Sequence, residues 1–175
     1  GQTCVAPDFL YVHESIKDKF INKIKVEIKK QFGVNPRLSD GLSRVINTKN
    51  HKRLVQMIDS DKVVFGGASD EENLYLSPTI MTDVFWEDKV MEEEIFGPIL
   101  PVLTFNNFDK LIDQLNQKPK PLAAYLFSGS SKRQKKFVQN YSFGGGTIND
   151  VIVHLVNHNL PFGGVGDSGM GAYHG

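Results

Sequence analysis

The chain contains a single cysteine, Cys4, close to its first residue. Such a thiol can act as a nucleophile if its pKa is lowered, because the thiolate is the reactive form. Thr3 could cap a short helix whose first turn holds Cys4, so that the thiolate faces the positive end of the helix dipole. Free cysteines are more often buried and inert, and Pro7 would end any helix that begins here. These residues alone leave both interpretations of Cys4 open.

An acidic and aromatic segment, Glu92-Glu93-Glu94-Ile95-Phe96-Gly97-Pro98, is a second place where a ligand could bind. A carboxylate can accept hydrogen bonds from a ribose, and an exposed ring can stack on a flat ring system. The ordinary alternative is a solvated surface, because acidic residues usually face water. The segment is therefore a candidate nucleotide-contacting loop with a plain structural alternative.

The glycine-rich segment Pro161–Gly171 contains the pattern G-x-G-x-x-G at Gly164, Gly166 and Gly169. A dinucleotide-binding unit also needs a preceding strand, a following helix and an acidic residue about 20 positions later. Only six residues follow Gly169, so we reject this fingerprint. No Gly-Lys-Ser/Thr follows either, which excludes a phosphate-binding P-loop. We interpret the segment as a tight packing loop.

Histidines are scattered along the chain, and none has metal-site spacing with Cys4, so we predict no metal site. The histidines are His13, His51, His154, His158 and His174. His154 and His158 are four residues apart and could share a helix face. With no carboxylate ligand nearby, we expect them to be structural or exposed.

The composition favours one intracellular α/β domain. The chain has 175 residues, enough for a real core. Its 20 basic and 20 acidic residues balance, which argues against a nucleic-acid partner. No apolar run is long enough to span a membrane. The lone cysteine and the lack of a signal peptide indicate a reducing compartment, and we predict a cytoplasmic location.

Apolar runs that alternate with helical periodicities predict a mostly parallel sheet covered by helices on both faces. The predicted strands and extended segments are 9–12, 62–65, 75–81, 99–105, 122–127 and 147–148. The predicted helices are 15–33, 48–58, 108–115 and 131–141. Ser15 is predicted as the N-cap of the first helix and Gly33 as its end. Pro78 fits an edge strand better than a central one.

Three segments, in this order along the chain, together resemble the catalytic domain of an aldehyde dehydrogenase. They are Gly1–Asp8 around the cysteine, Glu93–Pro98 and Pro161–Gly171. The segments Val5–Asp8, Asn149–His154 and Tyr173–Gly175 resemble the class 3 branch, which acts on fatty or aromatic aldehydes. The resemblance spans nearly the whole chain, so residues 1–175 are expected to form one catalytic domain.

The resemblance implies a role for each candidate residue. Cys4 is the nucleophile, whose thiolate adds to an aldehyde and later carries the product as a thioester. Glu94 holds the nicotinamide-side ribose of NAD or NADP, and Phe96 packs against that ribose or ring. Phe162 lines the aldehyde pocket, and Asn149 helps to shape it.

The resemblance also implies what these residues lack. The general-base Glu, the oxyanion-hole Asn and the dinucleotide-binding domain of the family precede the nucleophile, and no residue here matches them. We therefore expect this chain to be a catalytic-domain fragment that neither binds the dinucleotide tightly nor turns over aldehyde alone. The full-length protein is expected to be a homodimer. The choice between NAD and NADP is left open.

Three alternatives remain beside this hypothesis. An acylating relative would use the same thioester but pass the acyl group to coenzyme A. A non-catalytic binding or scaffold protein could be built on the same fold, with an inert Cys4. A generic α/β domain with no active site is disfavoured, because three motifs occur together and in family order.

Overall fold

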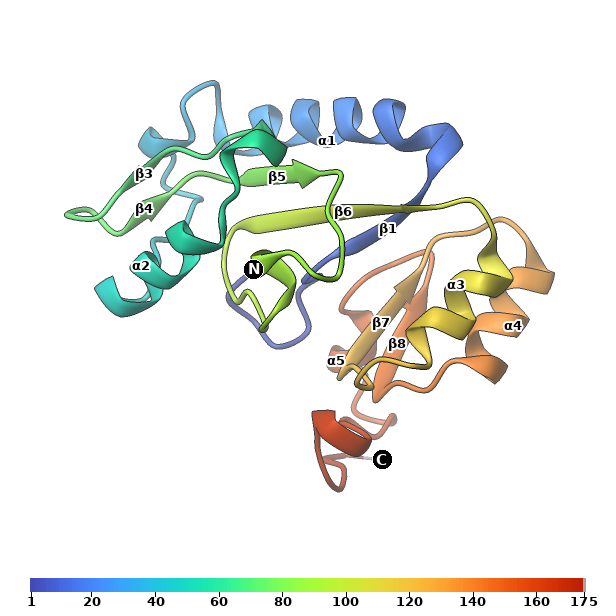
Figure 1. Cartoon of the computed structure of the whole chain (residues 1–175). Coiled ribbons are helices and arrows are strands. Elements are labelled where there is room, and N and C mark those ends of the chain that lie inside the picture. Colours follow the sequence, from blue (N-terminus) through green and yellow to red (C-terminus); the bar gives the residue numbers. More distant parts are fainter. Residues whose placement is uncertain (175) are drawn as a thin grey trace. The chain divides into compact units, whose positions relative to one another are not determined.

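The structure, a computed structural model, describes residues 1–174. The chain folds into two compact units, Gly1–Asn106 and a second unit that begins at Asn107 (Figure 1). Each unit has its own cluster of buried apolar side chains. Among the described residues, no helix is both long and apolar enough to cross a membrane.

The first unit is built on a sheet with the strand order β1-β6-β5-β2 (Figure 1). Its strands are β1 (Leu10–His13), β6 (Ile99–Phe105), β5 (Thr79–Thr82) and β2 (Val63–Phe65). β6 runs parallel to both β1 and β5, and only β2 is antiparallel. Every residue of β5 is buried, as expected for a strand with neighbours on both sides and layers on both faces. The predicted mostly parallel α/β architecture is confirmed.

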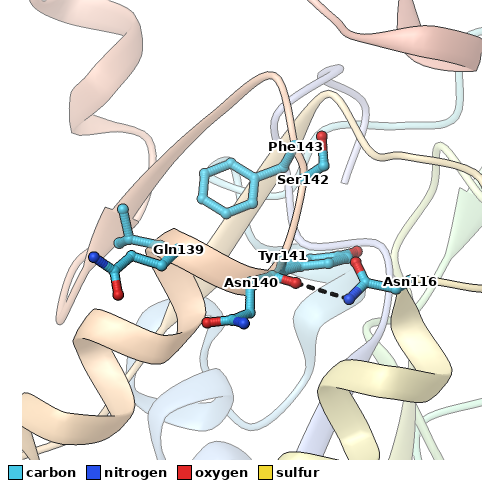
Figure 2. Close-up of a pocket in the computed structure, with 7 residues that line it drawn as sticks. Asn116, Gln139, Asn140, Tyr141, Ser142 and Phe143 are labelled. Atoms are coloured by element: carbon cyan, nitrogen blue, oxygen red, sulfur yellow. Dashed lines mark hydrogen bonds between the residues drawn. The ribbon is translucent and has the colours of Figure 1, made fainter.

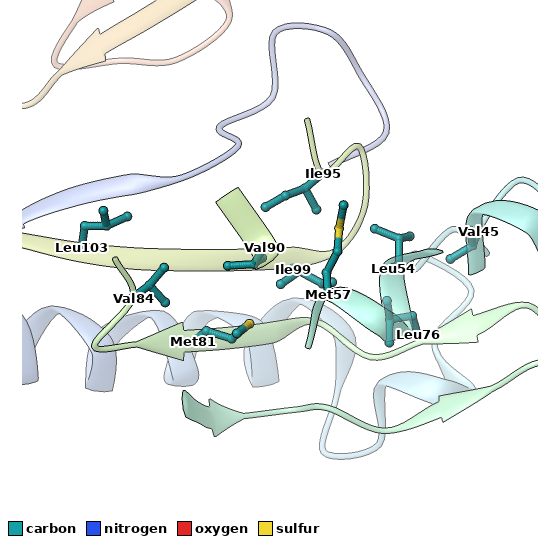
Figure 3. Packing of buried hydrophobic residues seen from close by; sticks show 10 residues of the cluster. All are labelled: Val45, Leu54, Met57, Leu76, Met81, Val84, Val90, Ile95, Ile99 and Leu103. Atoms are coloured by element: carbon teal, nitrogen blue, oxygen red, sulfur yellow. The ribbon is translucent and has the colours of Figure 1, made fainter. Parts of the chain in front are cut away.

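Helices cover both faces of this sheet. On one face lies α1 (Lys17–Phe32), which buries Ile21 against the strands. The four-residue spacing of Ile16, Phe20, Ile24 and Ile28 predicts an amphipathic helix, and the last three of these pack on the same cluster. Ile16 does not, because it precedes α1 and is 50% exposed. The other face carries α2 (Thr48–Met57) and the main core (Figure 3). The buried residues of that core are Val45, Leu54, Met57, Leu76, Met81, Val84, Val90, Ile95, Ile99 and Leu103.

The start of α1 differs from the prediction. Residues Glu14–Ile16 form a 3-10 turn, and the side chain of His13 accepts the N–H of Ser15 at 3.3 Å. Ser15 is therefore not the N-cap, because the preceding histidine takes the capping role. The predicted end is confirmed: Gly33 follows the last helical residue with φ 80°.

Pro78 is not part of an edge strand. It lies between β4 (Tyr75–Leu76) and β5, and β5 is internal because it pairs with both β2 and β6. Thr79, the first residue of β5, donates its N–H to Pro98 O at 2.9 Å. The missing N–H of Pro78 thus costs no ladder bond. β4 instead pairs with the short antiparallel strand β3 (Ser69–Asp70).

The second unit contains a parallel pair of strands with helices packed on it (Figure 1). The strands are β7 (Ala123–Leu126) and β8 (Gly145–Ile148). The helices are α3 (Phe108–Leu115), α4 (Ser131–Asn140) and the short α5 (Val153–Val156). Its core is formed by Ile112, Ala124 and Phe137, from α3, β7 and α4.

Short 3-10 turns join several of these elements, and one of them explains the glycine-rich segment. The turns are Glu14–Ile16, Pro36–Leu38, Ser60–Lys62, Lys89–Met91 and Gly166–Ser168. The Ser168 hydroxyl both accepts from Val165 N and donates to Val165 O, each at 2.9 Å. A Cβ at Gly164 would lie 2.1 Å from Ser168 O, so the backbone itself fills that space. The tight packing loop predicted here is confirmed.

Candidate active site

Cys4 lies in a single tight turn, and its side chain is exposed. The turn is closed by a hydrogen bond from Ala6 N to Thr3 O at 3.1 Å. It does not continue into a helix, because Pro7 has no N–H to offer and the chain extends toward β1. The sequence permitted a helix with Thr3 as its cap and Cys4 in its first turn. The structure has no such helix, so Cys4 does not face a helix dipole. The thiol is accessible, which a nucleophile requires.

Contacts on both sides of Cys4 fix this turn. The amide of Gln2 donates to Arg44 O at 2.9 Å and accepts from Ile46 N at 3.1 Å. Val5 is buried, with 2% of its surface exposed. Cys4 is thus a solvent-facing residue between two anchored neighbours.

The predicted cofactor-contacting loop alternates between the solvent and the core. Glu94 and Phe96 are exposed, whereas Ile95 and Gly97 between and after them are buried. Ile95 points into the main core of the first unit (Figure 3). Phe96 has φ 50°, in the left-handed region, and 40% of its surface is exposed. The loop therefore presents a carboxylate and an aromatic ring together on a backbone anchored beneath them.

The structure brings the Cys4 segment and this loop together within the first unit. The carboxylate of Asp8 accepts a hydrogen bond from Ile95 N at 3.0 Å. Gly1 packs on Gly97 so closely that an added Cβ would lie 1.9 Å from Gly97 O. Two of the three predicted motifs are therefore neighbours in space, although about 90 residues separate Cys4 from Glu94 along the chain.

Burial and nearby charges shift the pKa values of the two carboxyl groups beside this junction. Burial raises the pKa of Asp8, while the N–H groups of Ile95 and Phe96 and the charge of Arg53 oppose that rise. Partial burial also raises the pKa of Glu94, the nearby charge of Asp8 adds to the rise, and Arg53 again opposes it. Arg53 is thus the cation that favours the ionised form of both carboxyl groups.

The two predicted pocket residues belong to the second unit. Asn149 has φ 60° and follows β8. Its side-chain oxygen accepts from Ser128 N at 2.8 Å, and its amide nitrogen donates to Ser128 O at 3.2 Å. Phe162 is half-buried and exchanges both backbone hydrogen bonds with Tyr173 at 2.7 Å. Its ring lies 6.3 Å from that of His154.

The comparisons with known proteins cover the whole chain. The sequence profile described as "Aldehyde dehydrogenase family" matches residues 1–175. The chain belongs to the aldehyde dehydrogenase family. The family resemblance of its three motifs is thereby confirmed.

Relatives of this aldehyde dehydrogenase chain are similar over its full length. Aldehyde dehydrogenase family 3 member H1 of Arabidopsis thaliana is 48% identical over 179 residues, covering 100% of this chain and 37% of its own length. "Aldehyde dehydrogenase, dimeric NADP-preferring" of Mus musculus is 46% identical over 175 residues, covering 100% and 39%. The solved structure "Substrate bound state of Staphylococcus Aureus AldH" has a TM-score of 0.97 and 46% identity, covering 100% and 39%. The chain thus spans less than two-fifths of the length of these relatives.

Within this aldehyde dehydrogenase fold, sequence reasoning missed two residues of the candidate site. Asp8 was noticed only as part of the cysteine motif, and Arg53 not at all. Arg53 donates to Glu94 O at 3.0 Å and to Ile95 O at 2.6 Å. Its partners are backbone carbonyl groups about 40 residues away, and such contacts leave no pattern of residue types in the sequence.

His154 is buried in this aldehyde dehydrogenase unit, and His158 is exposed. Burial lowers the pKa of His154, and its Nε2 atom has no hydrogen-bond partner within the described part of the chain. Residues 1–174 contain no cluster of three or more His, Cys, Asp or Glu side chains that could hold a metal ion.

A shallow depression in the second unit lies apart from these residues (Figure 2). Asn116 donates across it to Asn140 O at 2.7 Å. Its lining is Asn116, Val138, Gln139, Asn140, Tyr141, Ser142 and Phe143. Since no predicted site residue lines this depression, it is not part of the candidate active site.

Proposed function

We propose that this chain supplies the nucleophile and the nicotinamide-side cofactor contacts of an NAD(P)-dependent aldehyde dehydrogenase of the family 3 kind. The proposed reaction oxidises an aldehyde to a carboxylic acid. The observation that carries the proposal is the junction between the Cys4 turn and the Glu94–Phe96 loop, formed by the hydrogen bond from Ile95 to Asp8. Membership of the aldehyde dehydrogenase family supports it.

In this proposal, Cys4 forms and breaks the covalent bond to the substrate. Its thiolate adds to the carbonyl carbon of the aldehyde, and its backbone N–H donates to the oxyanion that forms. Glu94 and Phe96 would hold the dinucleotide, which would supply the hydride acceptor; loss of that hydride would leave a thioester on Cys4. Water then attacks the thioester carbonyl, which releases the acid and returns the thiol. The family resemblance assigns activation of that water to a glutamate outside these residues.

Glu94 and Phe96 are suited to hold the nicotinamide-side ribose. The exposed carboxylate of Glu94 offers acceptor oxygens for ribose hydroxyl groups. The Phe96 ring, two residues further on, has an exposed surface against which a sugar or flat ring can pack. Both side chains lie on a backbone anchored by the buried Ile95, so little ordering is needed when a ligand binds.

Phe162 and Asn149 are proposed to form part of the aldehyde pocket in different ways. Phe162 contributes an apolar ring, and its backbone is fixed by the bridge to Tyr173. Asn149 shapes the pocket through its loop, because both ends of its amide are engaged by Ser128. We therefore assign no direct hydrogen bond from Asn149 to the substrate.

The proposal also includes a cytoplasmic homodimer without a nucleic-acid partner. The mouse relative whose name includes "dimeric" is 46% identical to this chain. Equal numbers of acidic and basic residues are consistent with a partner other than nucleic acid. A single exposed thiol is typical of a reducing compartment.

The test replaces the nucleophile in the full-length protein. We expect Cys4→Ala to lower the rate of aldehyde oxidation by at least about 10³-fold, with an unchanged circular dichroism spectrum because Cys4 is exposed. Iodoacetamide should label Cys4 stoichiometrically in the wild type. Formation of free acid without coenzyme A separates this function from an acylating relative. Full activity in Cys4→Ala, or an inert Cys4, would contradict the proposal.

A further inference from the structure

Arg53 directs its guanidinium group at the backbone of the cofactor-contacting loop. From α2 it donates to Glu94 O at 3.0 Å and to Ile95 O at 2.6 Å. Its side chain is 24% exposed, and it lies 3.5 Å from the Glu93 carboxylate. The planar fork of an arginine presents its N–H donors in a fixed geometry that suits two neighbouring carbonyl groups, whereas the donors of a lysine are not fixed in this way. Arg53 therefore fixes two successive carbonyl groups of the loop.

Asp8 bonds an N–H group of the same loop, whereas Arg53 bonds its carbonyl groups. Its carboxylate accepts from Ile95 N at 3.0 Å, and the N–H of Phe96 also favours its ionised form. Asp8 lies four residues after Cys4 and 87 residues before Ile95. The same residue thus belongs to the nucleophile segment and bonds the cofactor loop.

The loop needs such outside support because Phe96 is in an unfavourable backbone conformation. Its φ of 50° is in the left-handed region, where residues with a Cβ are strained. Strain of this kind persists only where the surroundings over-determine the backbone, and it concentrates at ligand-binding sites. Arg53 and Asp8 together bond the carbonyl and N–H groups on the N-terminal side of Phe96.

We propose that Arg53 and Asp8 are positioning residues that set Glu94 and Phe96 for the nicotinamide-side ribose and hold this loop in register with Cys4. The inference rests on the proposed function and adds residues that do not touch the substrate. Arg53 acts from α2 on the backbone of the loop, and Asp8 couples that backbone to the nucleophile segment. The positive charge of Arg53 also favours the ionised form of Glu94, which is the form with the most acceptor capacity for ribose hydroxyls.

The main test is Arg53→Met in the full-length protein, with Lys52→Met as the matched control. Lys52 is the neighbouring residue of α2, is 58% exposed and pairs with Glu71 at 3.1 Å. We expect Arg53→Met to raise the KM for NAD⁺ or NADP⁺ about tenfold, equivalent to about 1.4 kcal/mol. The extent of Cys4 labelling by iodoacetamide should stay the same. Lys52→Met should leave both quantities unchanged.

Two further variants separate positioning from a merely structural role. Arg53→Lys keeps the charge but loses the planar fork, so its KM for the dinucleotide should lie between those of wild type and Arg53→Met. Asp8→Asn keeps one acceptor oxygen and should raise the KM less than Arg53→Met does. A structural role would instead lower the labelled fraction of Cys4 and the melting temperature while leaving the KM of the folded fraction unchanged. If Arg53→Met does not fold, Arg53→Lys decides the matter by the same measurements.

The outcomes distinguish this inference from the function on which it rests. A wild-type protein that neither oxidises aldehydes nor reduces the dinucleotide overturns the proposed function. An active wild type, with an unchanged dinucleotide KM in both Arg53 variants, overturns the positioning role alone. A raised KM with normal Cys4 labelling supports both.

Discussion

Asn149 and Phe96 are two of the six described non-glycine residues in the left-handed region, and their loops are supported in different ways. Asn149 has φ 60° and Phe96 has φ 50°. The side chain of Asn149 bonds both backbone groups of Ser128, so this residue supports its own turn. The side chain of Phe96 has no polar group, and its loop is held by Asp8 and Arg53 from distant parts of the sequence.

This difference separates a turn that is held by its own side chain from a loop that is held by residues distant in the sequence. Asparagine is among the few residues that visit the left-handed region readily, because its short polar side chain bonds locally. Phenylalanine has no such compensation, and at about 1–2 kcal/mol the strain is a substantial cost for one residue. A strained aromatic residue that is exposed and supported from outside therefore points to ligand contact more strongly than Asn149 does.

The largest expected effect comes from removing the support beneath the Phe96 loop. Leu54 is fully buried and lies against Gly97. Leu54→Ala should lower the free energy of unfolding by about 3 kcal/mol, because the side chain leaves a cavity in a packed core. Val55→Ala, on the same helix but only half-buried, should cost less. Urea unfolding measures the free energy of unfolding of both variants. Equal losses would show that Leu54 is no more important for stability than a half-buried residue of the same helix.

A smaller effect is expected at Asn149, whose own side chain makes both hydrogen bonds to Ser128. Asn149→Ala loses both bonds to Ser128 and leaves a Cβ in the left-handed region, for a total of about 2 kcal/mol. Asn149→Gly loses the same bonds without the strain, so it should be the more stable of the two. The measurement is again the free energy of unfolding. An alanine variant as stable as the glycine variant would mean that the backbone at position 149 is unstrained.

Local periodicity and motifs were enough to predict the elements around the site. The four-residue spacing of Phe20, Ile24 and Ile28 predicted the side of α1 that packs on the sheet, but it missed the buried Ile21 and wrongly included the exposed Ile16. The apolar run of β6 predicted a buried strand. What the sequence could not provide was the order of the strands, because alternating strands and helices fit several orders. Pro78 misled for this reason: it precedes a central strand without interrupting its ladder.

The candidate site was predicted as a set of motifs and not as a set of contacts. Cys4, Glu94 and Phe96 stood out through their residue types and neighbours. Arg53 did not, because it acts on carbonyl groups that every residue possesses. The helix at Thr3 that the sequence left open does not form, because the single turn around Cys4 ends before Pro7. Side chains that bond distant backbone are visible only once the fold is known.

The strain at Phe96 can be measured by comparing two substitutions at one position. Phe96→Gly and Phe96→Ala both remove the ring, but only alanine keeps a Cβ in the left-handed region. We expect the glycine variant to be more stable by about 1 kcal/mol. The control pair is Glu92→Gly and Glu92→Ala, since Glu92, the residue after the 3-10 turn Lys89–Met91, has an ordinary right-handed backbone with φ −71°, and there alanine should be the more stable. If alanine is more stable than glycine at position 96 as well, Phe96 is not strained. That result would remove one support for the role of Arg53 and Asp8.

The last and smallest contrast concerns pH, because the pKa shifts in the two units change stability with pH in opposite directions. Burial lowers the pKa of His154 in the second unit below its ordinary value of about 6.5, so the unfolded chain binds a proton more readily than the folded one. The contribution of His154 to stability is therefore complete above about pH 6.5 and is lost as the pH falls through its folded pKa. The raised pKa values of Asp8 and Glu94 act in the opposite direction, since stability falls as their carboxyl groups ionise.

Urea unfolding of His154→Leu should show a smaller loss of the free energy of unfolding between about pH 7.5 and pH 5 than the wild type shows. His158→Leu, the same change at an exposed histidine, should lose as much stability as the wild type over this pH range. An equally reduced loss in both variants would mean that burial of His154 is not the cause.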